Sequence, residues 1–514
     1  MTPEPSVASP VAAEPDRRLH PWSWLFALIS GLRQFIVPLL VLLFAGRRGD
    51  GEGWWELAPM IGVAAIALVS IWQYFTYRYR IDSNSVVIRS GLLHRSLRQI
   101  PFARIHNVAI HQSPLHRLFG VADVKLESAG GTQPEAHMQV LTREQALALE
   151  ALVRRHARGD AAAATAVDGM QGPAAAPPSR LLLALSPGEI VRLGLISNRG
   201  MVVVAAAVAL LAQTSRGVFA DMVEAVRNLL FGYAESHRFD VPDYLLAGLL
   251  LLLGALLLLR LLSVALAFIQ YHGFRLEQSG RRLTVERGLF SRLRSSAPRR
   301  RIQAWTLVEG VLHRLLQRRS LRVDSAVAAA ADGSGQQRGL RELAPVATAA
   351  ACDQLVQALL PGRQWPPAHW QPLHPRAWWR LLLPGVFLTL VLCALLGWRF
   401  GSWGLLGLLW LPWAAFLARQ HARRAGWSFD GELLAVRAGW WSRHWRWADV
   451  DKLQALRLSR GPLDRHLGMA TLWLDTAGAG SFDPPLRLRY LPLADAEALL
   501  GRLQHAVAVR PLRW

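Results

Sequence analysis

One motif recurs three times in this chain with the same internal spacing. Its copies include "SPLHRLFGVADVKLES" (113–128), "GVLHRLLQRRSLRVDS" (310–325) and "GPLDRHLGMATLWLDT" (461–476). Each copy extends upstream to a glycine, which lies 29 positions before the residue aligned with Gly120 in all three. Because no copy carries an insertion, the motif indicates one compact unit. The distance between copies is typical of whole domains.

The aligned positions are a glycine, a proline, an arginine and a second glycine. They are Gly91, Pro101, Arg117 and Gly120 in the first copy, Gly288, Pro298 and Arg314 in the second, and Gly439, Arg465 and Gly468 in the third. The expected core residues are Leu115, Leu118 and Phe119, with Phe119, Leu316 and Leu467 at one shared buried position. Gly120 is expected to form a turn that needs a permissive backbone. The repeated arginine has two readings: a structural residue that binds loop carbonyls, or a contact with lipid phosphate.

Long apolar runs separate the motif copies, and they come in pairs. The pairs are 24–45 with 55–75, 200–213 with 244–269, and 378–398 with 402–418. A helix needs ~20 apolar residues to cross the bilayer core, so run 200–213 requires residues 190–199 as a partly interfacial lead-in. The composition, 52% hydrophobic, is more apolar than is usual for a soluble chain. The sequence therefore predicts six membrane spans arranged as three hairpins.

The predicted organisation repeats an entry element, a hairpin and a domain. It comprises a tail (1–22), hairpin 1 (23–75), domain 1 (76–158), an Ala/Pro linker (159–184), hairpin 2 (185–269) with an extracytoplasmic loop (214–243), domain 2 (270–362), hairpin 3 (363–418) and domain 3 (419–514). Ser186, Pro187 and Glu189 predict a capping box where hairpin 2 begins. Paired spans put all domains and both termini on one side, and their basic residues indicate the cytoplasm.

Each domain shows short alternating strands followed by one amphipathic helix. The helical patterns are 142–157, 346–360 and 493–507, and Thr142 with Gln145 predicts a capping box for the first. Strands followed by a helix indicate an α+β roll in which the helix closes one end of a bent sheet. The predicted fold class is thus membrane α-helical plus α+β.

Residues 77–130 resemble the bacterial pleckstrin-homology-like (PH-like) domain of membrane-flanked proteins. The three-copy, six-span layout is similar to the larger member of the YdbS/YdbT-type pair of bacterial membrane proteins, and the resemblance is weakest over 427–478. It implies two packed, nearly orthogonal sheets with a C-terminal helix in each domain, and a small two-span PH-like membrane protein as partner. Some relatives are associated with envelope stress and resistance to membrane-active peptides. The family has no defined biochemical activity to transfer.

Motifs for catalysis or metal binding do not emerge from the sequence. Cys352 and Cys393 lie far apart, and no CxxC, HExxH or GxSxG pattern is present. We therefore expect no enzymatic activity, no metal and no cofactor. A transporter or channel component is the alternative, although the charges inside the runs are arginines and the repeat is not inverted. A formal net charge of +22 without a recognition helix or aromatic RNA-binding motif does not favour nucleic acid.

The strongest basic cluster lies in domain 2, and it predicts contact with an anionic membrane surface. Its members are Arg281, Arg282, Arg292, Arg294, Arg299, Arg300, Arg301, Arg318 and Arg319. An anionic leaflet attracts each nearby arginine by about 1 kcal/mol. A solvated basic face and an acidic patch on a protein partner are the competing readings. The predicted function is that of a non-enzymatic bacterial inner-membrane protein, an envelope scaffold or a stress and antimicrobial-peptide-resistance factor.

Overall fold

The computed structural model describes residues 17–30, 32, 58–82, 84–91, 95–128, 136–163, 179–214, 240–325, 338–360, 362–476 and 484–509, and residues 220, 221, 224, 225, 227 and 228. Most of the first arm of hairpin 1, of the predicted linker and of the loop 214–243 lies outside these residues.

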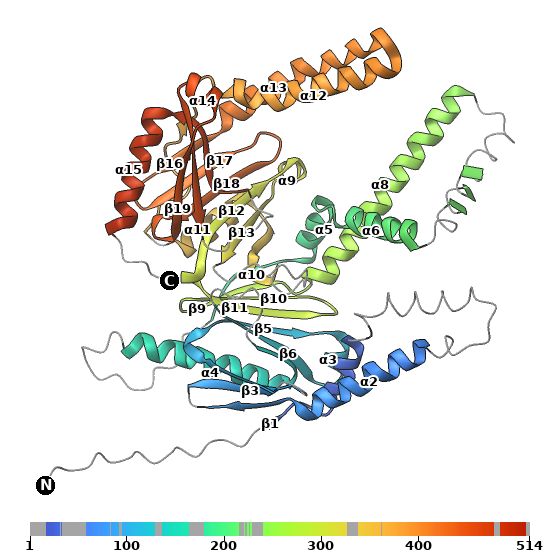
Figure 1. The fold of residues 1–514 in the computed structure, drawn as a ribbon, viewed down its shortest axis with the longest axis vertical. Helices are drawn as coiled ribbons and strands as arrows, with labels where there is room; N and C mark the ends of the chain where they lie inside the picture. Colours follow the sequence, from blue (N-terminus) through green and yellow to red (C-terminus); the bar gives the residue numbers. More distant parts are fainter. Residues whose placement is uncertain are drawn as a thin grey trace.

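Each domain contains two antiparallel sheets followed by a helix (Figure 1). Domain 1 comprises β1 (Arg17–Arg18), β2 (Arg78–Ile81), β3 (Ser85–Ser90), β4 (Ser96–Pro101), β5 (Ile105–Gln112), α3 (Pro114–Leu118), β6 (Val121–Ser128), β7 (Ala136–Thr142) and α4 (Arg143–Ala163). Domain 2 comprises β8 (Arg180–Ala184), β9 (Arg275–Ser279), β10 (Arg282–Arg287), β11 (Arg292–Pro298), β12 (Ile302–Glu309), α9 (Val311–Leu315), β13 (Arg319–Ser325), α10 (Arg338–Arg341), β14 (Glu342–Ala347) and α11 (Ala349–Leu359). Domain 3 comprises β15 (Gln371–Pro372), β16 (Gly426–Phe429), β17 (Leu433–Ala438), β18 (Arg443–Asp449), β19 (Leu453–Ser459), α14 (Pro462–His466), β20 (Met469–Thr476), β21 (Arg487–Pro492) and α15 (Leu493–Val509).

The C-terminal helix closes the core of each domain, as its amphipathic pattern predicted. In α4, Leu149 and Val153 are buried in one cluster with Met138 of β7. Burying a large apolar side chain contributes about 1.5–3 kcal/mol. The predicted capping box is present, since Thr142 N donates to Gln145 Oε1 and Gln145 N donates to Thr142 Oγ1, both at 3.3 Å. The helix therefore starts at the predicted place and stays on the core.

A short strand that precedes each apolar hairpin belongs to the domain that follows the hairpin. β1 pairs with β2, β8 with β9 and β15 with β16. The predicted boundaries missed these strands, which lie in the tail 1–22, the linker 159–184 and hairpin 3 (363–418). Strands of two to five residues carry too little alternation to be recognised. Each hairpin is thus an insertion between two hydrogen-bonded strands, which ties both of its ends to one sheet.

The sheets continue across the domain boundaries. β5 of domain 1 pairs with β11 of domain 2, and β12 of domain 2 pairs with β18 of domain 3, which makes two seven-stranded sheets. The core is shared as well, because Trp447 of domain 3 lies in the buried cluster of domain 2. Three separate domains were expected, but edge-to-edge pairing joins them into one stack (Figure 1).

The apolar helices all extend toward the same side of the stack, the right of Figure 1. They are α2 (Ala58–Thr76), α5 (Pro187–Ile196), α6 (Arg199–Thr214), α8 (Val241–Tyr271), α12 (Ala377–Phe400) and α13 (Trp410–Arg424), with η4 (Gly401–Leu409) between the last two. Among the described residues, α8 and the segment Ala377–Arg424 are long and apolar enough to cross a membrane, and α5 with α6 would be a third span bent by 52°. Within the third hairpin the arms touch, because a Cβ on Gly385 would lie 2.6 Å from Ala414 Cβ. Six spans are not established by these residues.

The bend between α5 and α6 is stabilised by an arginine of the opposite arm. Arg260 of α8 donates from Nη1 to the carbonyl oxygens of Leu195 and Ser197 at 3.1 and 3.3 Å. These carbonyls belong to the end of α5, where no intrahelical donor is available. Residues 190–199 were predicted to be a lead-in to the short run. Residues 190–196 instead belong to the separate helix α5, and its Ile190 is buried in the core of domain 2. Arg260 thus binds the carbonyl groups at the break between α5 and α6.

The repeated residues occupy special backbone positions. Gly91, Gly288 and Gly439 have φ of 112°, 115° and 81°. A Cβ on Gly288 would lie 1.9 Å from Ser291 O, so this hairpin tolerates no side chain there. Gly120 and Gly468 are also left-handed, and Gln317 adopts φ 54° at the aligned position. Pro101 and Pro298 precede the short helical turns η2 (Phe102–Arg104) and η3 (Arg299–Arg301).

Candidate functional site

The recurring motif forms a one-turn helix that links the first two strands of the second sheet in each domain, β5 to β6, β12 to β13 and β19 to β20. The residues that follow α3, α9 and α14, namely Phe119, Leu316 and Leu467, share one conformation, with φ near −90° and ψ near 0°. Their predicted equivalence is therefore confirmed, but they are half-buried rather than buried. Leu115 is 41% and Leu118 77% exposed, so the prediction that they are core residues was wrong. Each of these turns lies beside an apolar hairpin (Figure 1).

The one-turn helix of each domain, or the turn that follows it, contacts the first arm of the domain's own hairpin, with different chemistry each time. In domain 1 the ring centroid of Phe26 lies 4.1 Å from that of His116. In domain 2 Arg318 donates to both carboxylate oxygens of Glu189 at 2.8 Å. In domain 3 Arg380 Nε donates to Asp464 Oδ1 at 2.6 Å. These contacts fix the hairpins relative to the stack.

The bond from Arg318 revises the predicted capping box of hairpin 2. Ser186 does cap α5, since its Oγ accepts from Glu189 N at 3.4 Å. The reciprocal bond expected from the Glu189 carboxylate is replaced by its ion pair with Arg318. A charged partner offers a stronger hydrogen bond than a backbone amide does. The box is therefore half formed.

The repeated arginine connects one domain to the next. Arg117 Nη1 donates to Leu289 O at 2.8 Å, and Arg314 Nη2 donates to Trp441 O at 3.1 Å. Both acceptors lie in the turn that joins the third and fourth strands of the following domain's first sheet. The structural reading of this arginine is thus correct for two copies, with the acceptor in the next domain. Arg465, the third copy, is exposed.

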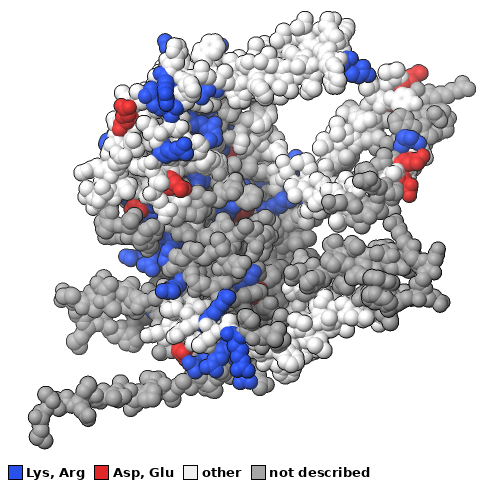
Figure 2. All heavy atoms as spheres, in the orientation of Figure 1, with Lys and Arg blue, Asp and Glu red and all other residues white. Residues whose placement is uncertain are grey.

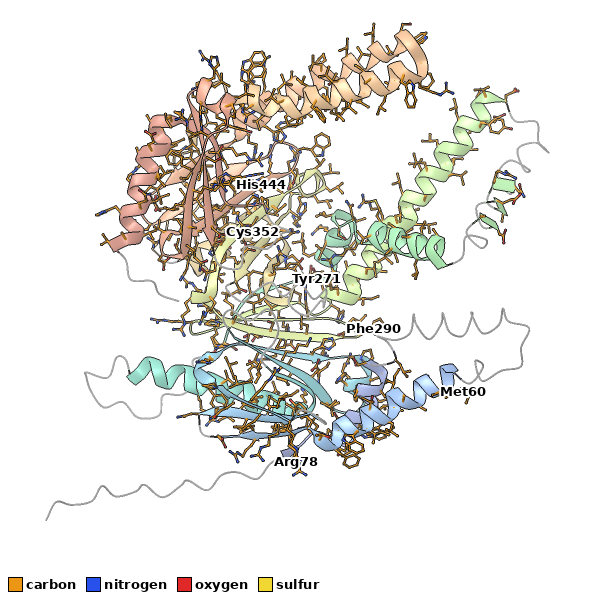
Figure 3. All side chains as sticks on the ribbon, viewed as in Figure 1. Met60, Arg78, Tyr271, Phe290, Cys352 and His444 are labelled. Carbon is orange, nitrogen blue, oxygen red and sulfur yellow. The ribbon has the colours of Figure 1, made fainter. Side chains whose placement is uncertain are left out.

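The nine arginines predicted to bind lipid do not form one surface. Arg299 N donates to Arg281 O at 2.8 Å, which places both at one end of β10. At the other end, Gly288 N donates to His272 O at 2.9 Å, just after α8. Because strands rise about 3.3 Å per residue, the six residues of β10 separate these ends by roughly 20 Å. The turn bearing Phe290, labelled in Figure 3, marks the hairpin end. The bond between Arg299 and Arg281 marks the far end.

Most of these arginines have structural partners. Arg282 binds Ser296 O at 3.3 Å, Arg294 pairs with Glu150 of domain 1 at 3.2 Å, Arg318 pairs with Glu189, Arg319 pairs with Glu309 at 3.3 Å, Arg299 is half-buried and Arg301 is 7% exposed. Arg281, Arg292 and Arg300 are exposed, and of the nine these are the ones open to solvent. Arg292 alone among these three lies at the hairpin end of β10 and β11. The direction of the strands, which composition does not reveal, decides at which end each exposed arginine lies.

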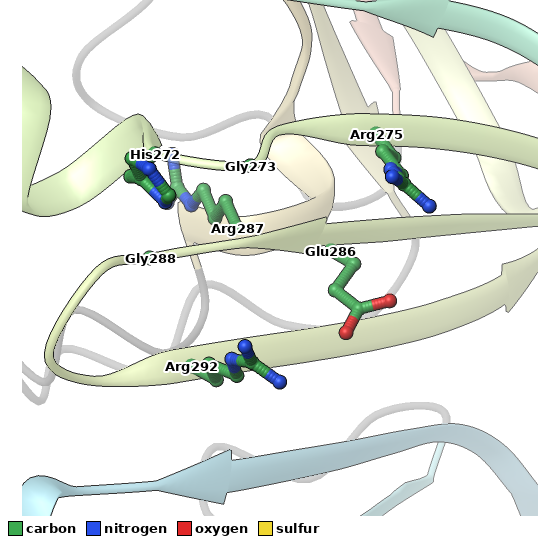
Figure 4. Close-up of a pocket in the computed structure, with 7 residues that line it drawn as sticks. All are labelled: His272, Gly273, Arg275, Glu286, Arg287, Gly288 and Arg292. Atoms are coloured by element: carbon green, nitrogen blue, oxygen red, sulfur yellow. The ribbon is translucent and has the colours of Figure 1, made fainter.

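A pocket of about 250 Å³ lies at the foot of α8 (Figure 4). Exposed Arg275 and Arg292 line it together with His272 and Glu286. Arg275 and Glu286 are cross-strand neighbours on β9 and β10, so the carboxylate offsets part of the positive charge. The remaining charge suits a small anionic group beside the end of an apolar helix.

Beneath the pocket lies a buried charge cluster that sequence reasoning missed. Tyr271 lies between two guanidinium groups, with Arg199 and Arg287 centred 4.7 and 4.8 Å from its ring. Its hydroxyl donates to Glu342, which also pairs with Arg287 at 3.0 Å. Burial disfavours the charged form of Glu342, yet Arg287 and Arg199 hold its pKa below the ordinary value. These residues join α6, α8, β10 and β14, and their wide separation in sequence gave no signal.

Comparison with known proteins identifies the repeated unit. A family described as "Bacterial PH domain" matches residues 27–157, 226–359 and 379–507, which is most of the chain. The chain belongs to this bacterial PH domain family. The "UPF0699 transmembrane protein YdbT" of Bacillus subtilis (strain 168) is 22% identical over 432 residues, which cover 82% of this chain and 84% of that protein. No solved structure matches.

Each matched range contains an apolar helix as well as strands of the sheets. The bacterial PH domains of this chain therefore comprise both parts, in line with the strands that flank each hairpin. The expected three-copy architecture is confirmed, including the third copy with its weaker motif. The recurring motif thus makes two kinds of contact. One joins a hairpin to its domain, and the other joins one domain to the next.

Proposed function

We propose that this chain is a non-enzymatic bacterial inner-membrane protein that carries three cytoplasmic bacterial PH domains as a rigid scaffold. The observation that carries the proposal is the stack itself. Two seven-stranded sheets run across the domain boundaries, and every described apolar helix leaves the stack on one side. A relative that this chain matches over most of its length is described as a transmembrane protein, and this supports membrane insertion. The stack would then lie along the membrane surface as a platform for envelope maintenance or for defence against membrane-active peptides.

Six spans in three hairpins would anchor this platform. Reporter fusions after Gly51, near Gly232 and after Gly401 should then read as periplasmic, and fusions after Asp160, Gly362 and Trp514 as cytoplasmic. The expectation follows from the paired apolar runs and the basic domains. A cytoplasmic reading near Gly232 would contradict it, because α6 and α8 would then fail to form a hairpin across the membrane.

The pocket beside α8 is the part of the platform suited to anionic headgroups. It opens at the hairpin end of domain 2, where Arg275 and Arg292 are exposed. The described helical arms are mostly free of Lys and Arg, whereas the domains carry them (Figure 2). Arginines next to an anionic leaflet gain about 1 kcal/mol each. The far-end arginines lie beyond the reach of that attraction, since the Debye length is about 10 Å at 0.1 M salt.

The lipid proposal predicts opposite results for two pairs of substitutions. Arg275→Gln with Arg292→Gln should reduce the affinity of the detergent-purified full chain for phosphatidylglycerol about tenfold at low salt, by loss of roughly 1–2 kcal/mol. The matched control, Arg281→Gln with Arg300→Gln, removes the same charge from the far end and should change little. Native mass spectrometry with phosphatidylglycerol and phosphatidylcholine measures both. Equal losses for the two pairs, or no loss for the first, would contradict the pocket's role.

A further inference from the structure

Among the described strands, the stack ends in an unpaired edge at domain 3. In the described residues, β5 and β12 each lie between two strands, with β11 and β18 as partners from the following domain. β19, their counterpart, pairs with β20 alone among the described strands, in a three-stranded sheet. β12 is almost wholly buried, whereas β19 exposes Gln454, Ala455 and Arg457. An unpaired edge strand presents free backbone donors and acceptors, and is a template for another strand.

The two occupied joints have the same register. Gln112 of β5 lies opposite Arg292, and Glu309 of β12 lies opposite Arg443. In each case the first residue occurs 21 positions after its repeat glycine, and the second occurs four positions after the next glycine. A strand that docks on β19 in this register would therefore place its residue four positions after the glycine opposite Arg460.

The second element of each joint is an arginine bound to a carbonyl of the next domain, and at domain 3 the described residues offer it no such acceptor. Arg117 and Arg314 bind a carbonyl in the turn of the following domain, and Arg465 has the same place after β19 with an exposed side chain. β19 and Arg465 thus have the same arrangement as the strand and the arginine that receive the next domain at the two joints inside the chain. The occupant that fits this arrangement is the first sheet of another PH-like domain.

We propose that β19 and Arg465 dock a PH-like domain of a different polypeptide. Its fourth strand pairs antiparallel with β19, and the turn before that strand accepts the hydrogen bond from Arg465. Main-chain pairing of this kind supplies affinity, and the side chains that face each other across the strands supply specificity. The proposal rests on the scaffold described under Proposed function, but not on the lipid pocket.

Charge decides against a second copy of this chain as the occupant. The corresponding strand of a second copy is β4, which lies at the edge of its sheet among the described strands and exposes Leu97, Arg98 and Gln99. In the shared register, its Arg95 would lie opposite Arg460 and its Arg98 opposite Arg457. Directly opposed like charges destabilise a strand pair. The internal joints instead oppose arginine to Gln112 or Glu309, with Arg443 lying 3.7 Å from the Glu309 carboxylate.

One described carboxylate near this edge would favour a second copy. Asp475 is the counterpart of Asp324, which binds Arg446 in the second joint, and it would attract Arg98. A second copy would thus form one attractive pair and two repulsive arginine pairs. The edge therefore favours a partner strand with an acidic or neutral residue opposite Arg460.

Cross-linking in native membranes tests the occupant. A photoreactive amino acid replaces Arg457 in the full chain, and the matched control replaces exposed Glu497 on α15 of the same domain. We expect Arg457 to cross-link a second polypeptide at a strand of its PH-like domain, and Arg465→Ala to lower that yield about tenfold by loss of a charged hydrogen bond. Cross-links to residues 95–100 of a second copy, or no more product than at Glu497, would overturn the proposal.

A charge reversal gives an independent result on purified protein. Arg460→Glu recreates the acidic residue of the Glu309 joint, and Arg95 of a second copy then becomes a suitable partner. The variant should form head-to-tail dimers and longer species by light scattering, at detergent and protein concentrations where the original chain does not. Self-association should disappear when Arg95→Glu is added. An Arg460→Glu chain that keeps the mass of the original would count against strand docking at β19, whatever the result of the lipid experiment.

Discussion

Replacing Asp324 with Ala is expected to destabilise the protein by about 3–5 kcal/mol, because it leaves a buried arginine without its counter-charge. Arg446 reaches from β18 of domain 3 into domain 2, where its Nη2 lies 2.5 Å from Asp324 Oδ2 and its Nη1 donates to Thr306 Oγ1 at 2.9 Å. Both charged side chains are 3% exposed. Water cannot solvate the guanidinium group once the carboxylate is removed.

The measurement is thermal unfolding of the detergent-purified full chain, with the unfolding free energy compared between variants. Arg446→Met combined with Asp324→Leu removes both charges and should recover most of the loss, since an apolar pair needs no counter-charge. Glu224→Ala is the control for an exposed pair, because Glu224 and Arg227 are 60% and 61% exposed, and it should change stability by less than about 1 kcal/mol. A loss below about 1 kcal/mol for Asp324→Ala would show that the joint between domains 2 and 3 is open to water.

Local sequence patterns predicted the local structure. The fixed spacing from Gly91 to Gly120 corresponds to two left-handed positions that bracket two strands and a one-turn helix. Thr142 and Gln145 correctly marked the start of α4. These features depend on residues near one another in the chain, where capping and backbone conformation are decided by a few side chains.

Contacts between distant segments could not be predicted in the same way. The bond from Arg117 to Leu289 spans 172 positions, and alternation along β5 does not say which edge of which strand lies beside it. The recurrence of Arg117 and Arg314 did indicate a structural contact, but the acceptor became evident with the pairing of β5 and β11. The predicted lipid cluster separated for a related reason. Its arginines are close in sequence, and the direction of β10 carries Arg281 away from Arg292.

Truncation of Trp447 should destabilise the joint between domains 2 and 3 by an amount comparable to that expected for Asp324→Ala. Trp447 lies on β18 opposite Trp305 of β12 and is fully buried. Its ring centroid is 3.9 Å from that of Trp365 and 6.3 Å from that of Trp305, with both pairs stacked. Trp447→Ala should cost about 3–5 kcal/mol, because the lost ring leaves a cavity that strands fixed on both sides cannot fill.

The control and the form of the unfolding transition give this prediction a second readout. Trp441, 56% exposed at the adjacent turn, can be changed to Ala with its backbone carbonyl retained for Arg314, and this should cost less than about 1 kcal/mol. Because Trp447 belongs to the buried cluster of domain 2, its loss should lower the stability of domains 2 and 3 together. Hydrogen exchange on both domains follows this, with faster exchange expected in β12 and β13 as well as in β17 and β18. Faster exchange confined to domain 3 would mean that the shared sheet does not couple the domains, and the platform would then be three hinged units instead of one stack.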